Sequence, residues 1–229
     1  MTDKSKIYLI YSVVALVSAL IMAVAFYIRG QRVQPGGDAY YSETTEFAPL
    51  LTLEKDLTLT RQDGQEVKVS DLKGKVWALA QFYATCPMCA KRNSQGLKAV
   101  YEKFKNHPDF KLICMTVNPE EDGVEQMKSY AEALGADASD WWFLTGEADG
   151  LKDYMVSEMK FDPVQKRTNP DEIAMKGELM HNMRIVVYNR NLSMVGSRSP
   201  YDARKNGDKA YEEELKALNQ MIDAVLKQQ

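Results

Sequence analysis

The segment at residues 76–83, VWALAQFY, constrains the fold of this chain more than any other segment. It has the length of a β-strand and is largely apolar, which is typical of a strand buried on both faces of a sheet. Directly after it, the sequence Thr85-Cys86-Pro87-Met88-Cys89 leads into a segment with helical spacing. We therefore expect a sheet covered by helices on both faces, with two cysteines at the end of a central strand.

The remaining periodicity predicts a mixed α/β domain. Residues 57–60 and 67–69 alternate around Gly64, as in a hairpin whose turn needs positive φ. Further strands are expected at residues 110–117, 142–145, 184–189 and 192–197, and helices at residues 89–106, 124–134, 147–160 and 209–227. Gly135 is a C-cap signal, and Asp208 suits an N-cap. Residues 162–180 show weak periodicity, so we expect a long surface loop there.

An uncharged run of 22 residues, at positions 7–28, precedes this domain. As a helix it would be roughly 33 Å long, enough to cross the hydrocarbon core of a bilayer. We expect a tail at residues 1–6, a single transmembrane helix at 7–28, a linker at 29–47 and the α/β domain at 48–229. The run exceeds the usual apolar core of a signal peptide, although Ala23-Val24-Ala25 resembles a cleavage site. The domain is expected on the periplasmic or extracytoplasmic side of a bacterial cell membrane.

The composition excludes several classes of function. The chain has 29 Lys and Arg against 32 Asp and Glu, a net charge of −3, which argues against a nucleic-acid partner. Three cysteines are too few for a domain of this size to depend on disulfides. The sequence contains no Walker A, dinucleotide-binding, zinc-protease or nucleophile-elbow motif. The chemistry is therefore sought among the few cysteines and histidines.

The Cys86-Pro87-Met88-Cys89 turn combines several features of a reactive cysteine site. The positive end of a helix dipole and the amides of the first helical turn both lower the pKa of a thiol. The spacing brings both sulfurs to one side of that turn, where they can form a disulfide or bind one metal ion. A strand followed by C-x-x-C and a helix is typical of thioredoxin-like redox motifs.

Several further segments resemble the Sco/SenC family of membrane-anchored, thioredoxin-fold copper proteins. The resemblance covers roughly residues 47–227 and the predicted anchor. It is carried by the run from Leu57 to Cys89, by Val117-Asn118-Pro119-Glu120-Glu121-Asp122, by Phe143-Leu144-Thr145-Gly146 and by His181-Asn182-Met183-Arg184-Ile185-Val186-Val187-Tyr188. The last three segments resemble the family's V-D-P-x-x-D (with Asn for the first Asp), F-L-T-G and H-T-x-x-I-Y patterns, in that order.

The resemblance implies a thioredoxin-like fold and a copper site formed by Cys86, Cys89 and His181. Two thiolates and an imidazole suit copper, as Cu(I) or Cu(II), on chemical grounds as well. The implied role is delivery of copper, or reduction of thiols, during assembly of the copper centre of cytochrome c oxidase. The expected partner is a subunit of that oxidase or another copper or thiol client.

The cysteine spacing departs from the family pattern. The family has C-P-x-x-C, whereas only Pro87 and Met88 separate the two cysteines here. The shorter spacing is that of disulfide oxidoreductases, so an envelope thiol-disulfide oxidoreductase with Cys86 and Cys89 as its catalytic pair is the alternative. Thioredoxin-like reductases place a proline before the strand that faces the active site, whereas this chain has Met183-Arg184 there. The missing proline, together with a nearby histidine, favours the copper-binding interpretation. A thioredoxin-fold module that only binds a partner is a third reading.

The other candidate residues have simpler explanations. His107 is expected in a solvated turn, and Cys114, in a strand among apolar residues, is expected in the core. Most of the methionines are expected to fill the core, with Met88 the best exception because it lies between the two thiols. Trp141 and Trp142 are expected to pack at the start of a strand.

Overall fold

The computed structural model describes residues 3–32, 47–84 and 93–228. The chain divides into two compact units, Met1–Thr45 and Glu46–Gln229. In the first unit, helix α1 (Asp3–Arg32) contains the uncharged run. Among the residues that the structure describes, no helix combines the length and the apolar character needed to cross a membrane.

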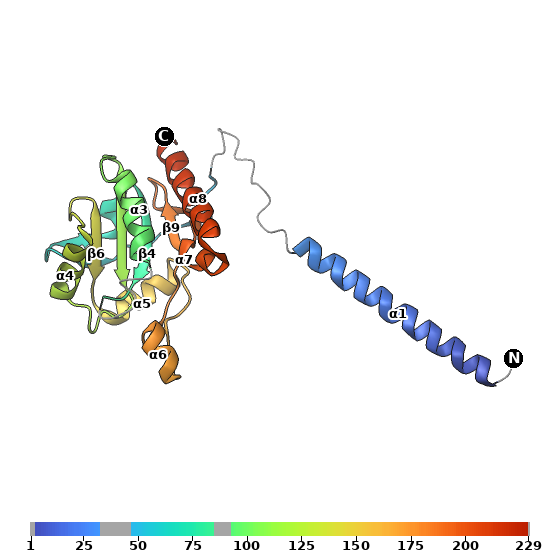
Figure 1. The fold of residues 1–229 in the computed structure, drawn as a ribbon. Helices are drawn as coiled ribbons and strands as arrows, with labels where there is room; N and C mark the ends of the chain where they lie inside the picture. The colour runs from blue at the N-terminus through green and yellow to red at the C-terminus, as the bar shows by residue number, and fades with distance from the viewer. Residues whose placement is uncertain (1–2, 33–46, 85–92, 229) are drawn as a thin grey trace. The chain divides into compact units, whose positions relative to one another are not determined.

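The second unit is built on a mixed sheet of eight strands in the order β1-β10-β9-β4-β5-β6-β2-β3 (Figure 1). β4 runs parallel to β5, which runs parallel to β6, whereas β9 is antiparallel to β4. The strands are β1 (Leu51–Thr52), β2 (Thr58–Arg61), β3 (Glu66–Lys68), β4 (Val76–Phe82), β5 (Phe110–Thr116), β6 (Trp141–Thr145), β9 (Ile185–Tyr188) and β10 (Ser193–Arg198). The expected mixed α/β fold is thereby confirmed.

Helices cover both faces of this sheet. On one face, α3 (Ser94–Phe104), α4 (Val124–Leu134) and α8 (Asp208–Lys227) contribute to a single apolar cluster with β4 and β5. On the other face, α5 (Ala148–Ser157) packs in a second cluster with residues of β2, β3 and the 3-10 helix η1 (Val69–Leu72). The alternation of β4 explains this arrangement: Ala78 and Ala80 belong to the first cluster, and Trp77 and Leu79 belong to the second.

The core of the second cluster includes an aromatic stack across two strands. Trp77 of β4 lies opposite Tyr188 of β9, with ring centroids 4.0 Å apart and planes 6° from parallel. Both side chains are fully buried. Because these residues are register partners, the stack helps to fix the alignment of β9 on β4.

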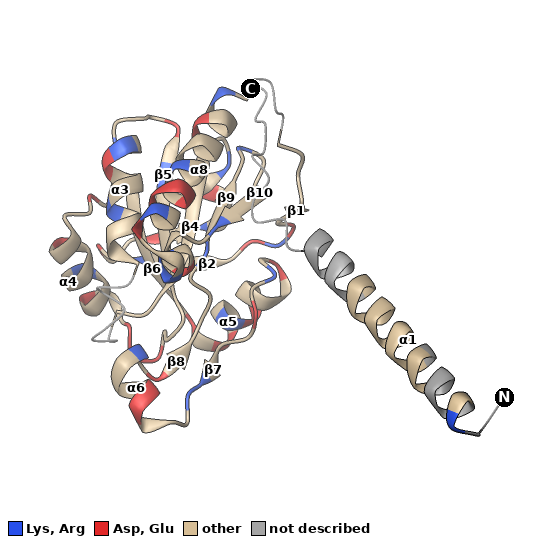
Figure 2. Ribbon diagram, turned by 45° about the vertical axis from the view of Figure 1, so that its right-hand side comes forward, with Lys and Arg blue, Asp and Glu red and all other residues tan. Residues whose placement is uncertain are grey.

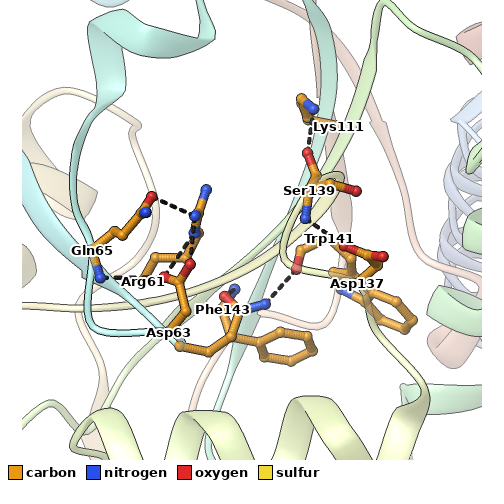
Figure 3. Close-up of polar contacts among 9 residues, drawn as sticks. Arg61, Asp63, Gln65, Lys111, Asp137, Ser139, Trp141 and Phe143 are labelled. Carbon is orange, nitrogen blue, oxygen red and sulfur yellow. Dashed lines mark hydrogen bonds and ion pairs between the residues drawn. The ribbon is translucent and has the colours of Figure 1, made fainter.

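Several predicted boundaries agree with the structure. α4 ends where expected, with Gly135 at φ 73° as its C-cap. The β2–β3 hairpin forms around Gly64, at φ 82°. Figure 3 shows how Arg61 closes this hairpin, with its guanidinium donating to the carboxylate of Asp63 and to the side chain of Gln65. Glycine is needed at position 64 because other residues rarely adopt that φ.

The prediction of a loop over residues 162–180 was wrong. The segment contains β7 (Gln165–Lys166) and β8 (Leu179–Met180), paired as a separate two-stranded sheet, with α6 (Pro170–Lys176) between them. The Asn169 side chain caps α6 and Pro170 starts it, but the helix buries none of its residues. A helix without a buried face has no apolar periodicity to reveal it.

Two ends of the domain also differ from expectation. The N-cap of α8 is Gly207, and Asp208 is the first helical residue. The short strand β1, which pairs with β10, and the turns α7 (Pro200–Ala203) and η2 (Arg204–Asn206) were not predicted. Elements this short leave too few residues for a periodic signal.

Charges of both signs are interspersed over the described part of the α/β unit (Figure 2). Within α6, for example, Asp171 and Glu172 lie in the first turn and Lys176 lies in the last. This distribution is consistent with the near-neutral composition, which argued against a nucleic-acid partner.

Substituting Ile222 with alanine tests the packing of α8 on the sheet. Ile222 is fully buried in the cluster that includes β4. We expect Ile222→Ala to lower the free energy of unfolding by about 3 kcal/mol, because a buried cavity replaces the side chain. Urea denaturation of residues 46–229 measures this. Glu213→Ala, at an exposed position of the same helix, should change stability by less than about 0.5 kcal/mol.

Candidate metal-binding site

The two predicted cysteine ligands, Cys86 and Cys89, lie outside the described residues, as does Met88. The described chain stops at Ala84, just beyond β4, and resumes at Asn93, the residue before α3. The surroundings of these two ends, and of the third predicted ligand, His181, therefore define what the structure contributes to the site.

Strand pairing brings residues 181–184, which we call the His181 segment, to the end of β4 that leads to the cysteines. Ala80 of β4 is the register partner of Ile185, the first residue of β9. Because the two strands are antiparallel, the residues before Ile185 extend beyond the same end of the sheet as the residues after Ala80. His181 lies in this stretch, directly after β8.

A buried carboxylate holds the end of β4. Asp122 is fully buried, and its Oδ2 accepts hydrogen bonds from the backbone N–H of Ala84 at 2.9 Å and from the Thr116 hydroxyl at 2.6 Å. Asp122 thus ties the last described residue before the cysteines to the loop that follows β5. The sequence analysis quoted Asp122 only as part of a family pattern and assigned it no role.

A second polar side chain links the other end of the cysteine segment to the His181 segment. Asn93 is buried, and its Nδ2 lies 3.5 Å from the carbonyl oxygen of Met183, to which it donates a long hydrogen bond. Hydrogen bonds therefore hold the chain on both sides of positions 85–92. Ala84, on the N-terminal side, is bonded to Asp122, and Asn93, on the C-terminal side, is bonded to Met183.

The ring of His181 is half-buried and oriented by a hydrogen bond. Its Nδ1 lies 3.0 Å from the carbonyl oxygen of Asn182. A carbonyl only accepts hydrogen bonds, so Nδ1 carries the proton and the lone pair of the neutral ring is on Nε2. Ligating histidines commonly have their second ring nitrogen bonded to a carbonyl in this way.

The donor set suits a soft cation. Two thiolates and a neutral imidazole are the ligands expected for copper, and the His181 tautomer fits that role. Among the described residues no group of three or more His, Cys, Asp and Glu side chains is arranged to hold a metal ion. The described part of the chain thus provides one of the three predicted ligands.

The family model described as SCO1/SenC matches residues 48–217, about three quarters of the chain. The chain belongs to the SCO1/SenC family. The match covers most of the α/β unit, including both cysteines and His181, and ends within α8.

A curated relative and three solved structures illustrate the relationship. The SCO1 protein homolog of Bacillus subtilis (strain 168) is 29% identical over 114 residues, which cover 49% of this chain and 59% of the relative. The match thus spans less than two thirds of that relative. A SCO1/SenC family lipoprotein from Bacillus anthracis has a TM-score of 0.63 at 19% identity, covering 80% of this chain and 100% of that protein.

Two further family structures have functional descriptions. Arabidopsis thaliana ScoI was solved with copper bound; its TM-score is 0.57 at 19% identity, with 77% of this chain and 99% of that protein covered. BsSco is described as having a disulfide switch and as a member of the Sco family of cytochrome c oxidase assembly proteins. Its TM-score is 0.55 at 21% identity, with 73% of this chain and 98% of that protein covered. At these identities the similarity establishes the shared fold, which is that of the thioredoxin-like Sco proteins.

Two residues that the sequence analysis set aside are placed as expected in this family member. His107 is exposed in the turn between α3 and β5, where its Nδ1 accepts a hydrogen bond from the Asp109 N–H at 3.2 Å. Cys114 is fully buried in β5, and the Trp141 indole N–H donates to its sulfur at 3.4 Å. Trp141 and Trp142 are both buried at the start of β6. Of the methionines, Met115, Met127, Met155, Met159 and Met221 are buried in the core, whereas Met22, Met175 and Met180 are exposed and do not fill it as expected.

A cavity of about 570 Å³ opens beside the His181 segment in this SCO1/SenC fold. Its lining includes Gln81 from β4, Val117 after β5, Met155 from α5 and Leu179 from β8. Gln81 also lines a small space together with His181 and Met183. The side chain of Gln81 thus borders both the larger cavity and the small space beside His181.

The burial of Cys114 predicts its reactivity. Burial raises the pKa of the Cys114 thiol to about 12, so at pH 8 only a very small fraction is thiolate, the form that reacts with alkylating reagents. We expect iodoacetamide at pH 8 to leave Cys114 unmodified in the reduced native protein and to modify it in urea. Peptide mass spectrometry after timed quenching measures both. Modification of native Cys114 as fast as that of a free cysteine peptide would contradict the burial.

Proposed function

We propose that this chain binds a copper ion through Cys86, Cys89 and His181 and passes it to a client protein during assembly of the copper centre of cytochrome c oxidase. The observation that carries the proposal is the pairing of Ala80 with Ile185, because the residues before Ile185, which include His181, and the residues after Ala80 leave this pairing at the same end of the sheet. Family membership and the copper-bound structure of Arabidopsis ScoI support the choice of metal.

The proposed ligands have distinct chemical requirements. Both thiols must be deprotonated to bind copper, so loading requires the thiolate forms of Cys86 and Cys89. His181 contributes a neutral nitrogen whose tautomer is set by the Asn182 carbonyl. If Cys86 and Cys89 are oxidised to a disulfide, an external dithiol must return two electrons and two protons before copper binds. Redox state would then control loading.

A thiol-disulfide oxidoreductase is the second candidate, and the two-residue spacing of the cysteines favours it. In that reaction the Cys86 thiolate attacks a client disulfide and releases one client thiolate. The Cys89 thiolate then attacks Cys86 in the mixed disulfide and releases the second client thiolate. The client gains two electrons, and Cys86 and Cys89 are left as a disulfide. His181 has no part in this exchange, so the two candidates differ in what they require of it.

We also propose that residues 7–28 attach the α/β unit to a bacterial cell membrane, with the unit on the extracytoplasmic side. The support is the uncharged 22-residue run, which α1 contains without a break. Membrane attachment would hold the copper site near a membrane-embedded client.

The copper proposal predicts a loss of affinity when His181 is replaced. We expect His181→Ala to weaken Cu(I) binding by at least about tenfold in competition with a chromophoric Cu(I) chelator, because one of three ligands is removed. His107→Ala is the matched control, since it removes the exposed histidine, and should bind as the wild type does. The rate of disulfide exchange by His181→Ala should stay unchanged. Equal binding by all three proteins would overturn the copper site.

The membrane proposal predicts how the chain fractionates. The full chain expressed in a bacterium should remain with the membranes after extraction with alkaline carbonate, whereas residues 47–229, exported with a cleavable signal peptide, should be released. Protease added to spheroplasts should digest the α/β unit of the full chain. Release of the full chain by carbonate would contradict anchoring, and protection from the protease would contradict the orientation.

A further inference from the structure

Gln81 is a buried polar residue in β4, a central strand whose residues are all buried. All seven residues of β4 are buried, and Gln81 is only 2% exposed. Placing an amide among apolar side chains is unfavourable unless the amide is hydrogen-bonded. The position of Gln81 therefore needs an explanation from its partners.

The side-chain oxygen of Gln81 holds the backbone next to His181. Its Oε1 accepts a hydrogen bond from the Asn182 N–H at 3.1 Å. The other end of the amide, Nε2, lies 3.5 Å from the sulfur of Met155, a weak acceptor. The hydrogen bond with Asn182 is thus the stronger of the two that this amide makes.

The register of the strands shows why a side chain is needed for this contact. The last β4–β9 register pair is Ala80 with Ile185, so Gln81 follows the last paired residue of β4 on that side. Asn182 precedes β9 by several residues, beyond the reach of the backbone ladder. The Gln81 side chain crosses this gap and extends the connection between the two segments.

Asn182 transmits this contact to His181. Its backbone N–H is bonded to Gln81, and its backbone carbonyl is the partner of His181 Nδ1 at 3.0 Å. Its side-chain Oδ1 accepts from the Arg184 N–H at 2.9 Å, which closes a turn before β9. Both backbone groups of Asn182 thus join a chain of hydrogen bonds from β4 to the imidazole.

We propose that Gln81 is a positioning residue for His181, fixing the Asn182 backbone that orients the imidazole and sets its tautomer. The inference rests on the proposed copper site, in which the Nε2 of His181 is a ligand. A purely structural role would require only that the position be filled, because an aliphatic side chain of similar volume packs well in an apolar strand.

The test compares Gln81→Leu with Gln62→Leu in the full chain purified in detergent. Gln62 is also buried, at 5% exposed; its amide donates to the Trp141 carbonyl at 2.7 Å and accepts from the Phe143 N–H at 2.8 Å, both in β6. Both variants remove one buried glutamine amide, and leucine introduces no sulfur that would bind copper.

The first measurement needs no metal. In the metal-free, reduced protein, amide hydrogen exchange at Asn182 should be at least about tenfold faster in Gln81→Leu than in the wild type, because the hydrogen bond that protects this N–H is lost. Exchange at Asn182 should not change in Gln62→Leu. Unchanged exchange in Gln81→Leu would overturn the proposal.

The second measurement is Cu(I) affinity by competition with a chromophoric chelator. Gln81→Leu should bind about tenfold more weakly than the wild type, as is typical when a group that orients a ligand is removed. Gln62→Leu should bind as the wild type does. The double variant Gln81→Leu with His181→Ala should bind no more weakly than His181→Ala alone, because Gln81 acts through His181.

A conservative variant keeps the test decisive if Gln81→Leu does not fold. Gln81→Glu retains an oxygen that accepts from the Asn182 N–H, and it should keep copper affinity within about threefold of the wild type. A loss of about tenfold or more in Gln81→Glu would show that the hydrogen bond is not the cause, and would overturn the proposal.

The outcomes separate this inference from the proposed function. If the wild type binds copper more tightly than His181→Ala but Gln81→Leu binds as the wild type does, the positioning role alone is wrong. If the wild type and His181→Ala bind equally, the copper site is wrong and the positioning role falls with it.

Discussion

The antiparallel pairing of β9 with β4 is the interaction on which the rest of the site depends. β4 lies between β9 and β5, and its two faces contribute to different apolar clusters, so its position in the sheet is strongly determined. The stack of Trp77 on Tyr188 adds a specific cross-strand contact to this pairing. A shift of β9 by one residue would move its side chains to the opposite face of the sheet. The register that brings His181 toward the end of β4 is therefore a consequence of core packing.

Polar side chains are buried where this core meets the proposed site. Gln81, Asn93, Thr116 and Asp122 are all buried near the end of β4 that leads to the cysteines, and each has a hydrogen-bond partner. Buried polar groups are costly unless bonded, but bonded networks fix one arrangement of the chain more strictly than apolar packing does. Here they connect the segments on both sides of the cysteines to the core and to the His181 segment. The described residues on both sides of the cysteines are thus fixed by hydrogen bonds to buried side chains.

The sequence was most informative where burial is periodic. The limits of β4, β5 and α4 followed from apolar runs and from the Gly135 cap, and the burial of Cys114 followed from its apolar neighbours. α6 was missed because it buries no residues, and β1 because two residues carry no pattern. The role of Gln81 was not predictable either. Its partner, Asn182, is about 100 residues away in the chain, and only the register of β4 and β9 brings the two together.

The arrangement around His181 bears on the choice between the two proposed functions. Disulfide exchange requires two thiols and access for the client disulfide, and it makes no use of a nearby imidazole with a fixed tautomer. Metal binding does make use of such an imidazole, because a ligand nitrogen must present its lone pair in a defined direction. The chain places a glutamine amide in β4, a fully buried strand where leucine would pack without any need for a partner. That amide holds the peptide whose carbonyl orients His181. The placement is intelligible if His181 is a ligand, and it has no evident purpose if Cys86 and Cys89 act alone. The positions around His181 thus favour copper binding even though the cysteine spacing is that of a reductase.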